Sequence, residues 1–251
     1  MDVPRDWWRT FFAGSAVDFW LRATTEEQTQ SEVEFIQRTL QVPSPARLLD
    51  VPCGAGRHSL ALAERGYQMT AVDISPAFLD VARANEAQRP NKVQWEQRDM
   101  RDLPWSRQFD GAFSFGNSFG YYEDAGNVEF LAAVGRVLKP GARFVLDTSY
   151  VAEVILPILQ QRSWYGMGDT ITLSERNYDP VSSRLEVEYT WIRNGEKDKR
   201  AMSARVYSYR EVCQLMEAAG FTDLKGFGSL AQEPFRLGSM RLLIAGTKKR
   251  D

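Results

Sequence analysis

The hydrophobic and polar positions of this chain predict alternating strands and helices along most of its length. Short apolar runs of strand length are followed by segments in which apolar residues recur at helical spacing. A hydroxyl cap and a proline at Ser75-Pro76 begin one helix, and Lys139-Pro140-Gly141 ends another. This pattern is typical of an α/β fold. We expect helices at residues 57–65, 76–85, 128–138 and 210–219, and strands at residues 48–51, 69–73, 93–97, 109–115, 143–147, 221–227 and 241–248.

The first 45 residues follow a different pattern and predict a helical cap. Residues 1–23 are rich in aromatic side chains, namely Trp7, Trp8, Phe11, Phe12, Phe19 and Trp20. A second helix is expected to begin at Thr25, which with Gln28 forms a capping box. Its apolar stripe consists of Val33, Ile36 and Leu40. We therefore expect a cap at residues 1–45 and a main domain at residues 46–251.

Residues 165–208 show the period-two alternation of half-buried strands. The alternating apolar positions are Leu185, Val187, Tyr189 and Trp191 on one strand and Met202, Ala204 and Val206 on the next. Asn194-Gly195 between them is typical of a two-residue hairpin turn. Residues 170–176 are expected to pair before this hairpin. We therefore predict a three-stranded antiparallel insertion at about residues 165–208.

The segment from Leu48 to Arg57 predicts a buried strand, a glycine turn and a helix in direct succession. Gly54 and Gly56 lack a Cβ atom where the backbone must turn sharply and lie against a ligand. Such a turn lies at the carboxyl end of a parallel strand, where open α/β sheets bind their ligands. We therefore expect the ligand site at this turn.

Three aspartates lie at or near the ends of successive predicted strands. Asp50 precedes the glycine turn, and Asp73 ends the next strand, 23 positions further along. A carboxylate at this second position is placed to accept both hydroxyls of a ribose. Asp99 follows the third strand, where it can accept from an adenine amine while the neighbouring Met100 covers the ring. This order of groups predicts a nucleoside site.

A dinucleotide is one candidate ligand, and an NAD-dependent oxidoreductase is an alternative function. The dinucleotide fingerprint requires a third glycine for close packing of the helix on the strand, and Ser59 stands at that position. Asp50 would also repel a pyrophosphate bound in the turn. The same carboxylate would attract an ammonium group. S-adenosylmethionine (SAM), an amino acid joined to adenosine, supplies one.

The chain resembles the class I SAM-dependent methyltransferases, over roughly residues 46–148. The segments that carry the resemblance are Asp50-Val-Pro-Cys-Gly-Ala-Gly-Arg57, Ala71-Val-Asp-Ile-Ser-Pro76, Asp99-Met100 and Leu138-Lys-Pro-Gly141. One departure is Pro52, which stands where the family usually has a glycine. The resemblance implies a Rossmann-like, seven-stranded, mostly parallel sheet with helices on both faces.

The resemblance also implies the roles of individual residues. In that family the residue matching Asp50 helps to hold the methionyl amine, and the glycine turn lies under the methionyl part. The residue matching Asp73 binds the ribose, and those matching Asp99 and Met100 frame the adenine. The expected cofactor site consists of Asp50, Pro52, Gly54, Gly56, Arg57, Asp73, Ile74, Asp99, Met100 and Phe115.

The antiparallel insertion is similar in architecture to those of small-molecule N-methyltransferases, including amino-sugar enzymes. In these enzymes the insertion helps to form the wall of the acceptor pocket or the dimer contact. We therefore expect a small-molecule acceptor and a monomer or homodimer.

Composition narrows the possible partners. The formal net charge is only −2, without a block of basic residues, which argues against a nucleic-acid substrate. Cys53 and Cys213 lie far apart, so their spacing suggests neither a disulfide framework nor a metal site. The sequence shows no apolar run near 18 residues and no cationic leader. We expect a cytoplasmic protein that binds no membrane and no metal.

A competing motif follows the fourth predicted strand. Residues 116–120 match G-x-S-x-G, the nucleophile elbow of α/β-hydrolases, with Ser118 as the nucleophile. That fold requires a histidine after the serine, whereas the single histidine of this chain, His58, precedes it. The order argues against a hydrolase. In a methyltransferase the same segment lies beside the sulfonium, where Asn117 and Tyr121 either line the substrate pocket or serve as loop structure.

His58 and the N-terminal aromatic residues each have two interpretations. His58 is a candidate general base beside the glycine turn or a side chain that packs locally, and Tyr121 is the other catalytic candidate. Trp8 and Phe12 either belong to a lid over the cofactor and acceptor or pack between helices. A ring face in such a lid would stabilise the sulfonium by about 0.5–2 kcal/mol. A SAM-binding protein without catalysis is a further alternative.

The chemistry of methyl transfer places few demands on catalytic residues. SAM carries an activated methyl group, so positioning supplies much of the rate, and well-oriented reactions gain roughly 7–11 kcal/mol. A hydroxyl or carbon acceptor requires a base, and a neutral amine does not. No residue in the sequence is an evident base. We therefore expect in-line methyl transfer to a small molecule, with a nitrogen acceptor favoured.

Overall fold

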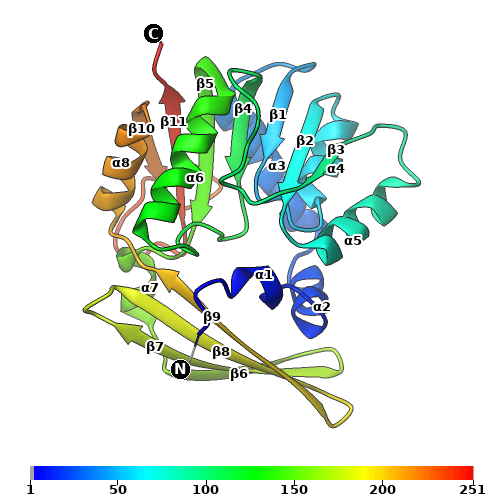
Figure 1. The fold of residues 1–251 in the computed structure, drawn as a ribbon, viewed down its shortest axis with the longest axis vertical. Coiled ribbons are helices and arrows are strands. Elements are labelled where there is room, and N and C mark those ends of the chain that lie inside the picture. Colours follow the sequence, from blue (N-terminus) through cyan, green and yellow to red (C-terminus); the bar gives the residue numbers. More distant parts are fainter. Residues whose placement is uncertain (1–2, 251) are drawn as a thin grey trace.

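A seven-stranded sheet forms the centre of the computed structural model, which describes residues 3–250 (Figure 1). Its strand order is β10-β11-β5-β4-β1-β2-β3, and only β11 runs antiparallel to its neighbours. The prediction of a mostly parallel, seven-stranded Rossmann-like sheet is confirmed. The strands are β1 (Arg47–Asp50), β2 (Gln68–Asp73), β3 (Gln94–Gln97), β4 (Phe109–Ser114), β5 (Leu138–Thr148), β10 (Phe221–Phe227) and β11 (Leu242–Lys248).

Helices cover both faces of this sheet. Successive side chains of one strand point to opposite faces of the sheet, since Leu48 packs with one buried cluster and Leu49 with the other. The first face is covered by α3 (Glu26–Leu40), α4 (Arg57–Glu64) and α5 (Pro76–Glu86), and the second by α6 (Asp124–Val137) and α8 (Tyr209–Ala218). Figure 1 shows α6 and α8 in front of the strands and α3 behind them.

The predicted helix caps are confirmed in part. Ser75 caps α5 through its side chain, which accepts from the Phe78 amide, as predicted. Thr25 caps α3 in the same way, but the predicted capping box is wrong in its second half. The Gln28 side chain donates to Glu32 rather than returning to the cap, because a buried carboxylate lies one turn ahead. A complete capping box is present at α8.

The boundaries of two further elements differ from the prediction. Helix α6 begins at Asp124, four residues before the predicted start, and β5 begins at Leu138 directly after the helix. The glycine of the predicted stop, Gly141, has a φ of 82° inside the long strand.

The insertion is a four-stranded antiparallel sheet rather than the predicted three-stranded one. Its strands, in order, are β6 (Arg162–Met167), β7 (Thr170–Asp179), β8 (Arg184–Arg193) and β9 (Glu196–Arg205). The sequence did not reveal β6 because this edge strand is largely exposed and lacks clear alternation; its Trp164 is 73% exposed. The Asn194-Gly195 hairpin is confirmed, with φ values of 51° and 81°. A short helix, α7 (Ala152–Ile158), precedes the insertion.

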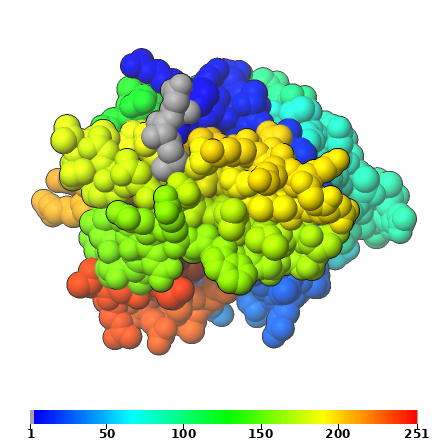
Figure 2. Space-filling view, turned by 90° about the horizontal axis from the view of Figure 1, so that it is seen from below, coloured from blue at the N-terminus to red at the C-terminus, as the bar shows by residue number. Residues whose placement is uncertain are grey.

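Two N-terminal helices, α1 (Trp8–Phe11) and α2 (Ser15–Arg22), lie between the antiparallel sheet and the main sheet (Figure 1). Phe11 and Phe19 pack against Trp191 on the buried face of β8, and the Trp7 indole donates to the Ser203 carbonyl at 3.0 Å. Figure 2 shows β6–β9 spread across the lower face of the molecule, with the N-terminal segment beside them.

The boundary of the predicted cap at residue 45 stays a prediction. Within it, α1 and α2 contact the antiparallel sheet, whereas α3 packs on the parallel sheet. Among residues 3–250, no helix combines the length and the apolar composition that crossing a membrane requires.

Gly120 links the two sheets, and replacing it tests this arrangement. Its carbonyl accepts from the Arg205 amide at 2.7 Å, its φ is 103°, and a Cβ atom would lie 2.6 Å from the Arg205 carbonyl oxygen. We expect Gly120→Ala to lower the free energy of unfolding by about 1–3 kcal/mol, measured by denaturant titration. Gly166→Ala in β6, where no atom lies within 4 Å of the added carbon, is the control. Equal stability of both variants would contradict this account.

Candidate functional site

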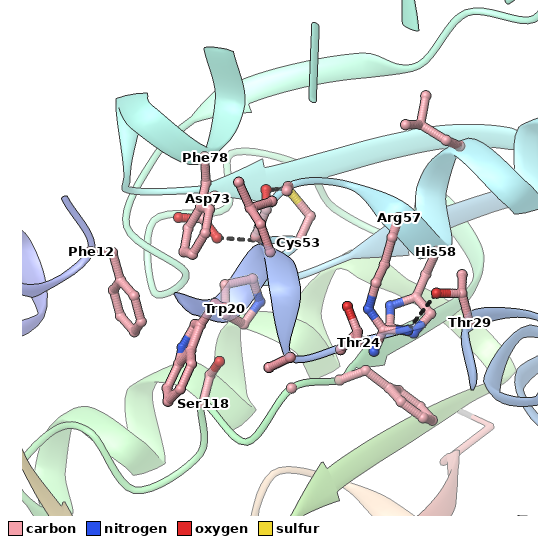
Figure 3. Close-up of a pocket in the computed structure, with 18 of the residues that line it drawn as sticks. Phe12, Trp20, Thr24, Thr29, Cys53, Arg57, His58, Asp73, Phe78 and Ser118 are labelled. Atoms are coloured by element: carbon pink, nitrogen blue, oxygen red, sulfur yellow. Dashed lines mark hydrogen bonds between the residues drawn. The ribbon is translucent and has the colours of Figure 1, made fainter. Parts of the chain in front are cut away.

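A cavity of about 430 Å³ lies where the parallel strands β1, β2 and β4 end. Residues of α1 and α2 close its other side (Figure 3). Seven of the predicted cofactor residues line it, namely Pro52, Gly54, Arg57, Asp73, Ile74, Met100 and Phe115. Asp50, Gly56 and Asp99 do not line it. Of the predicted substrate and catalytic residues, Trp8, Phe12, His58 and Tyr121 line the cavity, and Asn117 does not.

The two glycines of the turn have different surroundings. Gly54 has a φ of 54°, and no atom lies within 4 Å of the place where its Cβ would stand. It therefore leaves an open, backbone-lined surface on the cavity wall. Gly56 has a φ of 74°, and its Cβ would lie 2.3 Å from the Trp95 ring. Gly56 thus allows close packing, whereas Gly54 faces the space for a ligand.

Asp73 ends β2 and lines the cavity, as do Phe12 and Phe78 (Figure 3). One oxygen accepts from the Gly54 amide at 2.7 Å and the other from the Ser75 amide at 2.8 Å. Burial raises the pKa of Asp73 to about 6, although these amide hydrogen bonds oppose the shift. The carboxylate is thus fixed by the backbone of two neighbouring turns.

Asp50 lies below the glycine turn. It is 1% exposed and accepts a hydrogen bond from the Ser59 hydroxyl at 2.7 Å. Burial raises the pKa of Asp50 to about 7, and the nearby Asp73 raises it further, while Ser59 and Arg57 oppose the shift. Ser59, which replaces the third glycine of the dinucleotide fingerprint, thus holds this acid in place.

Asp99 lies beside the cavity and is engaged by neighbouring side chains. Arg101 donates to both of its oxygens, at 2.9 and 2.7 Å, and the Tyr122 hydroxyl donates at 2.9 Å. Partial burial favours the neutral acid, but these donors hold the pKa of Asp99 below its usual range. Tyr122 and Met100 line the cavity at this end.

A second group of polar residues lines the opposite side of the cavity (Figure 3). The Arg57 guanidinium donates to the Thr29 hydroxyl at 3.0 Å and also to Glu32. His58 also contacts Glu32, since its Nε2 lies 2.8 Å from a carboxylate oxygen of that residue. Burial lowers the pKa of His58, although the hydrogen bond to Glu32 opposes this shift.

Thr29 and Glu32 are site residues that the sequence analysis missed. Both lie on the helix face of α3 that carries Val33, Ile36 and Leu40, since residues three or four apart share a face. Both are buried, with Glu32 0% exposed. A carboxylate on an otherwise apolar helix face was the available signal, because buried acids require partners.

Aromatic and hydroxyl groups line the cavity between these two sides. They include Trp8, Phe12, Trp20, Ser118 and Tyr121, of which Trp20 and Ser118 were not among the predicted pocket residues. Burial raises the pKa of Tyr121 well above its usual value, although a hydrogen bond with Ser118 opposes the shift. Its phenol is therefore protonated at pH 7.

Asn117 serves the loop rather than the cavity wall. Its side-chain oxygen accepts from the Ser149 amide at 2.7 Å and from the Thr148 hydroxyl at 3.3 Å. It thereby ties the segment after β4 to the end of β5, and its φ of 69° belongs to a tight turn. Of the two interpretations of Asn117, the structure favours loop support.

Comparison with known proteins agrees with this geometry. A family profile described as a methyltransferase domain matches residues 48–141. The glycine/sarcosine N-methyltransferase of Aphanothece halophytica is 25% identical over 228 residues, which cover 88% of this chain and 83% of that protein.

Solved structures share the fold over nearly the whole chain. The CcbJ methyltransferase of Streptomyces caelestis has a TM-score of 0.81 at 16% identity, covering 96% of this chain and 99% of that one. The SAM-bound amino pentose methyltransferase CalS10 of Micromonospora echinaspora has a TM-score of 0.69 at 20% identity, covering 92% and 95%.

The domain match spans the glycine turn and the strand ends that form the cavity. The similarity to the N-methyltransferase extends beyond it, along most of the chain. Together with the strand order and the turn geometry, these findings identify the chain as a SAM-dependent methyltransferase with a Rossmann-like fold.

Proposed function

We propose that this enzyme transfers the methyl group of SAM to a nitrogen atom of a small molecule. The observation that carries the proposal is the state of the candidate bases on the described cavity wall. His58 Nε2 lies 2.8 Å from an oxygen of the buried Glu32, so this nitrogen is engaged by α3 and not by a molecule in the cavity. Tyr121 retains its phenolic proton. A neutral amine requires neither residue as a base, whereas an alcohol does.

Two of the compared proteins support the same acceptor class. The Aphanothece halophytica enzyme is named for the amines glycine and sarcosine, and CalS10 is named for an amino pentose. Both acceptors are small molecules. The cavity of about 430 Å³ has the size range of small-molecule sites, which supports a small acceptor beside the cofactor.

The cavity residues fit SAM group by group. The Asp73 carboxylate is the acceptor for the ribose hydroxyls, and Met100 with Ile74 covers the adenine. The open surface above Gly54 accommodates the methionyl chain, with Pro52 and Phe115 beside it. The three predicted cofactor residues that do not line the cavity act indirectly. Gly56 shapes the turn, Asp50 contributes negative charge near the methionyl amine, and Asp99 fixes Tyr122 at the adenine end.

When bound, SAM supplies a methyl group already activated on a cationic sulfur. The contribution of the chain is therefore to orient the acceptor and to exclude water. Trp20, Phe12 and Tyr121 provide aromatic faces on the cavity wall, and such faces stabilise a nearby cation by about 0.5–2 kcal/mol. In this proposal, the aromatic N-terminal residues form the lid over the cofactor and acceptor.

Replacing Asp73 tests the ribose assignment. We expect Asp73→Asn to weaken binding of S-adenosylhomocysteine, the demethylated cofactor, by about 10- to 100-fold. The physical reason is the loss of charge-assisted hydrogen bonds, worth roughly 1.5–3 kcal/mol each. Isothermal titration calorimetry measures the affinity. Asp80→Asn, on the exposed surface of α5, is the control. Unchanged affinity in the Asp73 variant would remove this residue from the ribose site.

The pH dependence of binding tests both buried acids. In the ligand-free chain, the pKa of Asp73 is raised to about 6 and that of Asp50 to about 7. Each must be ionised to accept a hydroxyl or to attract an ammonium group. We expect S-adenosylhomocysteine affinity to level off only near pH 8 and to fall below that, by up to about tenfold per pH unit for each protonated acid. Titrations between pH 5 and 8 check this. A flat profile over that range would contradict it.

Acceptor labelling tests the proposed function itself. SAM with a radiolabelled methyl group is incubated with glycine, amino sugars and other amines, and with matched alcohols and phenols. We expect label on nitrogen, with a rate that rises as the amine loses its proton. Tyr121→Phe is expected to change kcat/KM by less than about tenfold, whereas loss of a general base costs about 10²–10⁴-fold. Label found on oxygen, or a larger loss in Tyr121→Phe, would refute the proposal.

A further inference from the structure

A buried carboxylate lies behind the cavity wall. Glu32 of α3 is 0% exposed and accepts hydrogen bonds on both oxygens. One oxygen accepts from His58 Nε2 at 2.8 Å and from the Arg57 guanidinium. The other accepts from Arg241 at 2.9 Å and from Gln28 at 3.3 Å. Although burial opposes ionisation, these partners hold the pKa of Glu32 well below its usual range.

The network continues through Arg241, which directly precedes β11. Its guanidinium donates to Asp147 at the end of β5 at 2.8 Å, and Asp147 accepts from the Gly116 amide at 3.1 Å. Gly116 lines the cavity. Glu32 thus connects one N-terminal helix with the helix after the glycine turn and, through Arg241, with the loop after β4.

Stability alone does not account for this arrangement. Buried ion pairs cost desolvation, and well-packed apolar residues are often as stabilising. In this network, however, the charges fix the direction of one side chain that reaches the cavity. Arg57 donates to Glu32 and to Thr29, and its side chain retains 26% exposure. A guanidinium has five N–H donors, so others stay available to a ligand.

We propose that Glu32 is a positioning residue, which holds Arg57 where the amino-acid carboxylate of SAM binds. This inference rests on the proposed placement of SAM and is independent of the acceptor. Arg57 and Asp73 line different parts of the cavity (Figure 3). With the ribose at Asp73 and the methionyl chain above Gly54, the amino-acid end extends toward Arg57. A guanidinium forms paired hydrogen bonds with a carboxylate when its orientation is fixed.

Two nucleoside ligands separate positioning from structural support. S-adenosylhomocysteine carries the amino-acid group, and 5′-methylthioadenosine lacks it. We expect Glu32→Gln to weaken binding of S-adenosylhomocysteine by about 10- to 100-fold, because the oriented charge-assisted contacts are lost. Binding of 5′-methylthioadenosine is expected to stay within about twofold. Calorimetry measures both affinities, and thermal unfolding reports on the fold. Glu34→Gln, exposed on the same helix, is the control.

Two further variants strengthen the test. Arg57→Gln should reproduce the selective loss, and the double variant Glu32→Gln/Arg57→Gln should add little to it, because both changes remove one interaction. If Glu32→Gln does not fold, Thr29→Val removes the other partner that orients Arg57. It is expected to weaken S-adenosylhomocysteine by about 3- to 10-fold, again without affecting 5′-methylthioadenosine.

The outcomes that overturn the inference are distinct. Equal weakening of both ligands would show that Glu32 supports only the fold. Unchanged affinity for S-adenosylhomocysteine with a raised KM for the acceptor would assign Arg57 to the acceptor instead. If neither ligand bound the unaltered chain, the placement of SAM itself would fail, and the inference with it. Failure of nitrogen methylation alone would leave these binding differences intact.

Discussion

The hydrogen bond from the Gly54 amide to the Asp73 carboxylate is the interaction on which the site depends. It joins the ends of β1 and β2, which are neighbours only because the parallel register places Asp50 beside Ala71. The turn must have positive φ at Gly54 to present this amide. A side chain at Gly54 would both strain the backbone and occupy the open surface. At this turn the cavity wall is therefore formed by backbone.

Charge is distributed around this surface in two separate groups. Asp50 and Asp73 share one region with few cations, so burial dominates and their pKa values rise. Glu32 is also buried but is surrounded by Arg57, Arg241 and His58, so its pKa falls. The first group includes Asp73 on the cavity wall, and the second holds the Arg57 guanidinium by hydrogen bonds.

The N-terminal helices complete the cavity from the opposite side. Trp7, Phe11 and Phe19 anchor them in the aromatic cluster on the antiparallel sheet, while Phe12 and Trp20 face the cavity. Different members of one aromatic segment thus pack on the antiparallel sheet and line the cavity. The antiparallel sheet thus supports these helices, and none of its residues lines the cavity itself.

Local patterns in the sequence determined the parallel strands, the glycine turn, the Ser75 cap and the hairpin at Asn194, since each depends on residues close together in the chain. The exposed edge strand β6 left no such pattern. Side-chain direction was decided by the tertiary structure, which turns Asp99 toward Arg101 and Asp50 toward Ser59. The same holds for Glu32, whose partners lie 26 and 209 positions away. Periodicity encodes which face of a helix is buried, whereas packing alone determines which distant groups meet there.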